Sequence, residues 1–124
     1  MAEYFYFTQG DSLPNLDSRV PDLQRIEPRI DYPDSSNAWF TGGQSMNFAV
    51  RWTGHLTISM AGEYTFYLGS DDGSKLFLNG AMIIDNDGLH GFRTRTSVPM
   101  SLGVGPQRLT VLYFQKQGAN GARF

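Results

Sequence analysis

The stretch LGSDDGSKLFLNG, residues 68–80, places two adjacent aspartates, Asp71 and Asp72, between two segments with the composition of β-strands. A tight turn needs one Asp or Asn followed by Gly, so the second carboxylate has no evident role in the turn. The stretch ends in Asn79 and Gly80, the strongest two-residue signal for a β-hairpin. We therefore expect strands on both sides of each turn.

Short strands separated by turn residues are predicted along most of the chain. Apolar residues alternate with polar ones from Asn47 to Thr53 and onward to Ile58, as in a half-buried strand. Further strands are expected at residues 4–7, 64–68, 75–78, 82–84, 93–100 and 109–114. The last of these is a nearly continuous apolar run, which is typical of a strand buried on both faces. No segment has helical periodicity, so the pattern predicts an all-β protein, either a β-sandwich or a flattened barrel.

Residues 10–43 differ from the rest of the chain because they are rich in Pro, Asp and Ser and show little periodicity. Their four prolines disfavour a helix or a central strand. We expect a long loop with short strands at most, and a segment of this length without structure suggests an insertion with a role. Four apolar residues could attach it to the core: Val20, Leu23, Ile26 and Ile30.

Length and composition favour one domain and exclude several kinds of protein. A chain of 124 residues has the length of one domain, here residues 1–124, which we interpret as a module taken from a larger protein. The net charge of −2 and the lack of a Lys/Arg run argue against a nucleic-acid surface or a polybasic membrane patch. The apolar runs are far shorter than the roughly 20 residues of a transmembrane segment.

The chain has no cysteine and begins without the features of a secretory signal. Disulfides, thiolate metal sites and thiol nucleophiles are therefore excluded, whereas the compartment stays open. The start of the sequence predicts that any signal segment either was removed or never existed.

An enzyme is not predicted. The two histidines, His55 and His90, have no partner at metal-ligand spacing and no serine in a nucleophile motif, and are interpreted as an exposed strand residue and a loop residue. Glycoside hydrolysis needs two carboxylates that face each other about 5 to 10 Å apart. Asp71 and Asp72 do not suit that role, because neighbouring side chains point apart.

A calcium site suits the two aspartates better. Calcium takes six to eight oxygens from carboxylates, amides, backbone carbonyls and water, so two adjacent Asp residues and a second polar loop can form its site. From spacing alone, a plain turn is the simpler interpretation of the pair. The other acidic residues, around Asp85 and Asp87 and at Asp31 and Asp34, are expected to lie in solvated loops.

The segments WTGHL, AGEYTF, SDDGSKLFLNG and MIID, which follow one another between residues 52 and 85, resemble the signature of the PA14 domain family. Weaker similarity covers residues 16–30 and 106–114, so nearly the whole chain is involved. The resemblance implies a two-sheet antiparallel β-sandwich, used as a module in adhesins, flocculins, toxins and glycosidases and generally not itself catalytic.

In the lectin members that this resemblance suggests, two adjacent aspartates joined by a cis peptide bind a calcium ion, which coordinates vicinal hydroxyls of a sugar. Asp71 and Asp72 match that pair. The loop QGANGA would supply the other ligands, from Gln117, Gly118 and Asn120. Sugar contacts are expected from loops 41–46 and 86–96, with Gln44, His90 and Arg93 as hydrogen-bond donors. The fungal insertions that select the sugar have no counterpart here, so the sugar is not predicted.

Two functions follow as hypotheses. The first is a calcium-dependent carbohydrate-binding module of an adhesion protein, with a glycan or glycoprotein as partner and an extracellular or cell-surface location. The second is a structural or protein-interaction module of a larger assembly, inside or outside the cell, in which the aspartates only form a turn. Neither hypothesis includes a nucleic acid or a membrane-spanning segment.

Overall fold

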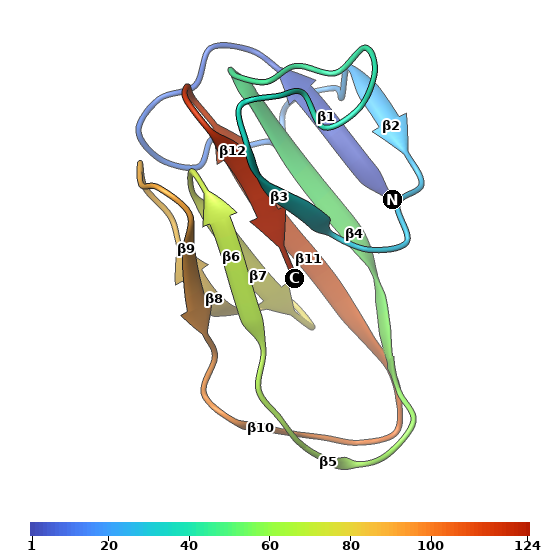
Figure 1. The fold of residues 1–124 in the computed structure, drawn as a ribbon. Coiled ribbons are helices and arrows are strands. Elements are labelled where there is room, and N and C mark those ends of the chain that lie inside the picture. The colour runs from blue at the N-terminus through green and yellow to red at the C-terminus, as the bar shows by residue number, and fades with distance from the viewer.

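The computed structural model describes residues 1–124 and contains twelve β-strands, ten of which form two facing sheets (Figure 1). No helix long and apolar enough to span a bilayer is found. The larger sheet has the order β2-β1-β4-β11-β7-β8. Its strands are β1 (Ala2–Tyr6), β2 (Leu23–Arg25), β4 (Phe48–Ile58), β7 (Ser74–Leu78), β8 (Ala81–Asn86) and β11 (Gly105–Gln115).

The smaller sheet has the order β3-β12-β6-β9 and lies in front of the larger one in Figure 1. Its strands are β3 (Asp31–Ser35), β12 (Asn120–Arg123), β6 (Tyr67–Asp71) and β9 (Arg93–Thr96). A separate pair, β5 (Gly62–Tyr64) and β10 (Met100–Leu102), lies at one end of the molecule. Neighbouring strands run antiparallel throughout, which confirms the predicted two-sheet sandwich.

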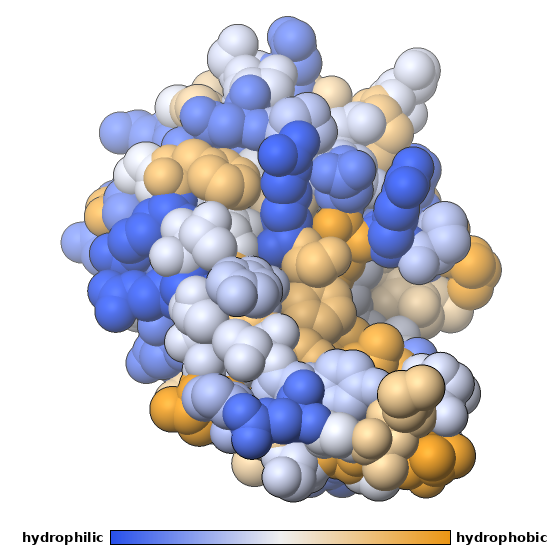
Figure 2. All heavy atoms as spheres, turned by 60° about the horizontal axis from the view of Figure 1, so that its bottom comes forward, coloured by the Kyte–Doolittle hydropathy of each residue, from blue (hydrophilic) through white to orange (hydrophobic).

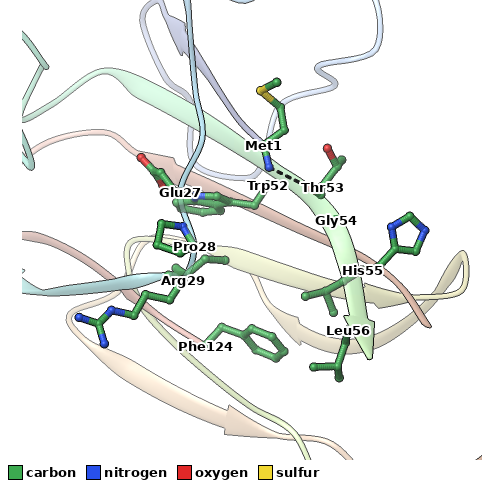
Figure 3. Close-up of a pocket in the computed structure, with 12 residues that line it drawn as sticks. Met1, Glu27, Pro28, Arg29, Trp52, Thr53, Gly54, His55, Leu56 and Phe124 are labelled. Atoms are coloured by element: carbon green, nitrogen blue, oxygen red, sulfur yellow. Dashed lines mark hydrogen bonds between the residues drawn. The ribbon is translucent and has the colours of Figure 1, made fainter. Parts of the chain in front are cut away.

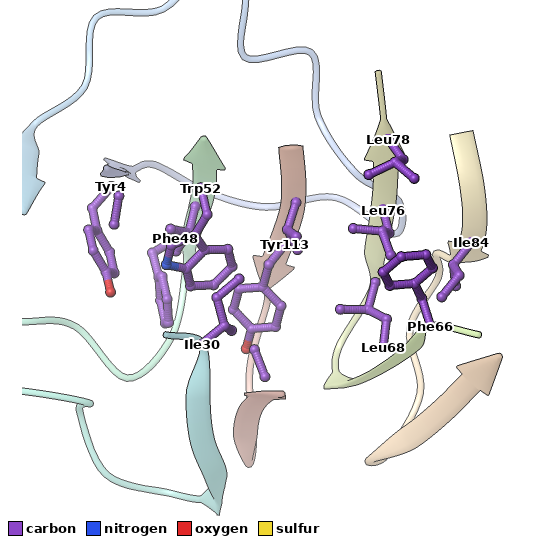
Figure 4. Packing of buried hydrophobic residues seen from close by; sticks show 14 residues of the cluster. Tyr4, Ile30, Phe48, Trp52, Phe66, Leu68, Leu76, Leu78, Ile84 and Tyr113 are labelled. Atoms are coloured by element: carbon purple, nitrogen blue, oxygen red, sulfur yellow. The ribbon is translucent and has the colours of Figure 1, made fainter. Parts of the chain in front are cut away.

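The main core lies between the sheets and is rich in aromatic rings (Figure 4). Because alternate residues of a strand face opposite sides, Phe48, Val50 and Trp52 of β4 all point into it. Trp39 enters from the loop before β4, and its ring stacks on Tyr32 with the centroids 4.1 Å apart. The core therefore holds both the strands and this loop in place.

A second, smaller cluster covers the outer face of the larger sheet. It contains Phe5, Leu16, Ala49 and Phe114, all buried. Phe114 lies in this cluster while its neighbour Tyr113 lies in the main core. The prediction that residues 109–114 form a strand buried on both faces is therefore confirmed at its C-terminal end.

Two predicted strands, residues 64–68 and 93–100, are each split in two. β5 ends at Tyr64 and β6 begins at Tyr67, while β9 ends at Thr96 and β10 begins at Met100. Both breaks fall where the chain passes from the four-stranded sheet to the two-stranded one. They are joined to each other, because Ser97 Oγ accepts a hydrogen bond from Phe66 N at 2.9 Å and Ser97 N donates to Phe66 O at 2.8 Å.

Residues 10–43 form the two short strands β2 and β3 and otherwise follow an irregular path. Pro33 lies in β3, at the edge of its sheet, where a missing amide donor is tolerated. Leu23 and Ile30 pack on the core as predicted. The prediction was wrong for Val20 and Ile26, whose side chains are 87% and 78% exposed.

The end of the molecule at β5 and β10 exposes apolar side chains (Figure 2). Met60, Val98 and Val104 lie in the loops that flank these two strands, and each is at least 70% exposed. Hydrophobic atoms are visible in the middle of this face, among charged groups. The aspartate pair lies at the opposite end of β6.

Candidate cation-binding site

Asp71 and Asp72 lie where β6 ends and the chain turns into β7, near the upper end of the sandwich in Figure 1. Their peptide bond is cis, as the family resemblance implied. Gly121 of β12 pairs with Asp71, so Asn120, the first residue of β12, lies next to the pair. The structure thus brings together three of the predicted ligand residues, and both aspartate side chains are buried.

Asp72 joins the loops around the site. Its Oδ1 accepts a hydrogen bond from the backbone N–H of His90 at 3.3 Å, and its Oδ2 accepts one from the N–H of Lys116 at 3.0 Å. One carboxylate therefore holds the loop after β8 and the loop after β11 against the end of β6.

Gln115 connects Asp72 to the loop that contains Gln117 and Gly118. This fully buried side chain accepts a hydrogen bond from Asp72 N at 3.0 Å through Oε1. Its Nε2 lies 2.9, 3.3 and 2.7 Å from the carbonyl oxygens of Gln117, Gly118 and Ala119. The amide therefore fixes the path of the loop, and each carbonyl oxygen keeps a lone pair for a further partner.

Asp71 makes its hydrogen bond through the backbone, because Tyr113 Oη donates to Asp71 O. Burial, followed by the nearby carboxylates of Asp72 and Asp34, raises the pKa of the Asp71 side chain to about 7, and His90 opposes this shift. Asp34 is exposed, as expected, but it lies on strand β3 rather than in a loop and comes close to Asp71. The site therefore concentrates negative charge that the surrounding residues do not neutralise.

The side chain of Asn120 has an amide oxygen that accepts no hydrogen bond. Its Nδ2 donates to the carbonyl oxygens of Asn37 and Ser45, at 3.0 and 3.1 Å, which anchors the loop before β4. Its Oδ1 is buried and has no hydrogen-bond partner. A buried polar atom without a partner is costly, and this one belongs to the residue that precedes Gly121, the strand partner of Asp71.

The chemical types of the oxygen groups at this site are those that calcium binds. No three side chains of His, Cys, Asp or Glu converge so as to hold a metal ion. A cation would therefore take amide and backbone oxygens in addition to two carboxylates, which is the mixture that calcium accepts. The raised pKa of Asp71 and the unpaired Oδ1 of Asn120 both describe groups that a bound cation would satisfy.

The three predicted sugar-contacting residues differ in whether their polar side-chain groups are already hydrogen-bonded within the protein. His90 faces Asp72 with its backbone, while both its ring nitrogens lie 2.8 Å from carbonyl oxygens, of Gly91 and Asn86. Arg93 donates to Asn86 Oδ1 at 2.8 Å. Gln44 is exposed and precedes Ser45, whose carbonyl anchors Asn120. Of the three, Gln44 is therefore the residue whose side-chain amide makes no hydrogen bond within the protein.

A buried polar layer supports the aspartates from below. Asn86, expected in a solvated loop, is fully buried, and its Nδ2 donates to Arg93 O at 2.9 Å and lies within 3.4 Å of Ser70 Oγ and Ser74 Oγ. Asp87 likewise accepts hydrogen bonds from Leu13 N and Gly88 N. These residues were not predicted, because their partners are distant in sequence.

A pocket of about 320 Å³ lies away from the aspartates, between β4 and the C-terminus (Figure 3). Glu27 lies at its inner side, and its oxygens accept hydrogen bonds from Tyr4 Oη, Tyr32 Oη and Trp52 Nε1 at 2.7 to 2.8 Å. Burial, together with the hydrogen bond to Glu27, raises the pKa of Tyr32 to about 12, although the contact with Tyr4 opposes the shift. Glu27 therefore fastens the long N-terminal segment to the core, and both of its oxygens accept hydrogen bonds from core side chains.

Fold and site together define an all-β sandwich module with a buried acidic pair at the end of one sheet. The family model of the PA14 domain matches residues 1–119, and the chain belongs to this family. PA14 domains are mostly binding modules within larger chains.

Known relatives include two different kinds of protein. The chain is 25% identical to a solved PA14 sugar-binding domain from an RTX adhesin, with a TM-score of 0.80 over 98% of this chain and 84% of that one. It is 27% identical to a solved anti-sigma factor domain-containing protein, with a TM-score of 0.78 over 98% of this chain and 39% of that one. Anti-sigma-I factor RsgI3 of Acetivibrio thermocellus is 34% identical over 83 residues, which are 62% of this chain and 12% of that protein.

Proposed function

We propose that this domain binds a carbohydrate through a calcium ion held by Asp71, Asp72 and Asn120. The observation that supports this most strongly is the buried, unpaired Oδ1 of Asn120, which precedes the strand partner of Asp71, at the end of the sheet where Asp71 lies close to Asp72 and Asp34. The similarity to a sugar-binding PA14 domain supports the ligand class. Calcium, when bound, would supply a coordination centre for two adjacent sugar hydroxyls.

The chain's own residues hold and shape the site. Asp72 keeps two loops in position by accepting their backbone N–H groups. Gln115 orients the 117–119 loop, so that carbonyl oxygens of Gln117 and Gly118 complete the set of proposed ligands. Gln44 is proposed to donate a hydrogen bond to the sugar from the rim, with His90 contributing to the loop that borders the site.

The similarity to an adhesin domain and to anti-sigma factor proteins supports a place in the extracellular or cell-surface part of a larger protein. A second function, as a protein-interaction module, is favoured by one observation. The β5 and β10 end exposes Met60, Val98 and Val104, and clustered apolar surface marks interaction sites.

Thermal unfolding with calcium or with EGTA tests the proposal. A ligand selective for the folded state stabilises it by about 2.7 kcal/mol at a concentration 100 times its Kd. We expect calcium to raise the melting temperature by several degrees and EGTA to reverse the rise. A melting temperature that changes neither with calcium, added up to about 10 mM, nor with EGTA would overturn the calcium site.

A further inference from the structure

The outer face of the smaller sheet has a groove of about 590 Å³, lined on β6 by Tyr67 and Gly69, which precede Asp71 on the same strand. Residues with the same parity on a strand point to the same face, so Tyr67, Gly69 and Asp71 of β6 share the outer face. Four residues of strand span about 13 Å, which is longer than one sugar ring. The groove therefore ends at Gly69, two residues or about 7 Å along β6 from Asp71 of the proposed cation site.

Two neighbouring strands carry glycine beside the groove, which lets the ring of Phe92 lie close against the sheet. A Cβ on Gly69 would lie 2.8 Å from Thr94 Oγ1 and 2.9 Å from Phe92 Cε1. A Cβ on Gly121 would lie 3.2 Å from Phe92 Cδ2. The Phe92 ring thus lies over both glycines, and because Gly121 pairs with Asp71, it forms the part of the groove nearest the acidic pair.

The side chains along the groove combine rings with hydrogen-bonding groups. Tyr67, Phe92 and Phe124 are 59%, 37% and 38% exposed, so these aromatic rings are open to a ligand. Polar groups lie beside them at Thr94 and at the guanidinium groups of Arg29 and Arg123. Arg123 is paired with Asp31 at 3.1 Å, whereas no ion pair is formed by Arg29. Arg29 and Phe124 also line the pocket of Figure 3, where both are labelled.

We propose that this groove binds further sugar rings of an oligosaccharide whose first ring is held at the cation site. The inference rests on the function proposed above. A sugar ring has an apolar face that packs on aromatic side chains and hydroxyls at its edge that need polar partners, and the groove offers both. The domain would then recognise a stretch of a glycan chain rather than a single sugar.

The test compares chain lengths on an array that carries each sugar as a monomer and as linear chains of two to six units, in 1 mM calcium. For the best series, affinities of wild type, Tyr67→Ala and Arg29→Ala are then measured by calorimetry. Both side chains are exposed, so both variants should fold. Met82→Ala, at a 49% exposed site on β8 of the other sheet, is the matched control.

We expect wild-type affinity to rise about tenfold or more from the monomer to the trimer. Tyr67→Ala should lower affinity for the trimer by three- to tenfold and leave the monomer unchanged, while Met82→Ala changes neither. Equal affinity for monomer and trimer, or a trimer affinity that Tyr67→Ala does not alter, would overturn the groove and leave the calcium-bound monomer site intact. Absence of calcium-dependent binding at every length would instead overturn the proposed function, and the groove with it.

Discussion

At the scale of single residues, the two adjacent aspartates have different surroundings. Asp72 accepts backbone N–H groups from two loops, whereas the carboxylate of Asp71 faces other carboxylates and receives no such donors. The second carboxylate of the turn therefore has a structural task, and the proposed function assigns the ligand role mainly to the first. The two residues should respond differently to substitution.

Asp71→Asn should abolish the rise in melting temperature with calcium, because it removes a charged ligand. Without calcium, at pH 8, the variant should be at least as stable as wild type, since it also removes repulsion from Asp72 and Asp34. Thermal unfolding with calcium and with EGTA measures both effects. Asp85→Asn, at an exposed position on β8, is the control and should keep the calcium response. A calcium response retained by Asp71→Asn would contradict its role as a ligand.

The stability of the calcium-free protein should depend on pH through Asp71. Its pKa is about 7 in the folded state against an ordinary value of 3.8, so the folded state keeps a proton that the unfolded chain has lost. Its contribution to stability therefore falls as pH rises from about 4 to 7 and is constant above that range. Asp71→Asn should lack this component, which urea unfolding at a series of pH values would reveal as a difference in slope. Parallel curves for the two proteins would rule out the raised pKa.

Calcium affinity should also depend on the protonation of Asp71, but it should rise with pH where the stability contribution falls. A carboxylate must lose its proton to bind a cation, so the affinity should fall as pH drops below about 7. Calorimetry at pH 6 and pH 8 should accordingly give weaker binding at pH 6.

At the scale of elements, three loops meet because single side chains connect them across the sandwich. Asn120 anchors the loop before β4, Asp72 anchors the loop after β8, and Gln115 shapes the loop after β11. Trp39 adds a ring from the first of these loops to the core. The site is therefore positioned by packed, hydrogen-bonded elements rather than by the turn alone.

Gln115→Glu should destabilise the fold and weaken calcium binding. The substituted side chain can still accept from Asp72 N but cannot donate to the three loop carbonyls, and it adds a charge near the acidic pair. Loss of buried hydrogen bonds of this kind costs about 2 to 4 kcal/mol. Urea unfolding should show this loss for Gln115→Glu and almost none for Gln107→Glu, a control on the same strand whose Oε1 only accepts from Asn79. Equal stability of the two variants would contradict the role of Gln115.

The sequence predicted the strands and the aspartate pair better than the contacts around them. Local alternation located β4 and β7, and the family resemblance indicated that the QGANGA loop lies beside Asp71 and Asp72. Alternation continued through Thr65 and Phe66 although the chain changes sheet there, because a period of two does not say which sheet a residue joins. Glu27, Asn86 and Gln115 were missed since each is defined by partners far away in sequence.

At the scale of the whole molecule, the sandwich separates two kinds of surface. The acidic site and the groove lie at one end and along the outer face of the smaller sheet, whereas the exposed apolar residues lie at the β5 and β10 end. A glycan could thus be bound at one end while the other faces a neighbouring domain. The same arrangement suits the relatives, in which a domain of this kind is part of a longer chain.

The most direct test of the central claim is a glycan array probed with the wild-type domain in 1 mM calcium, in EGTA, and with Asp71→Asn in calcium. The account predicts a defined set of glycans bound by wild type in calcium, with the signal lost in EGTA and lost with Asp71→Asn. Glycan binding that persists in EGTA, or no glycan bound in any condition, would contradict it.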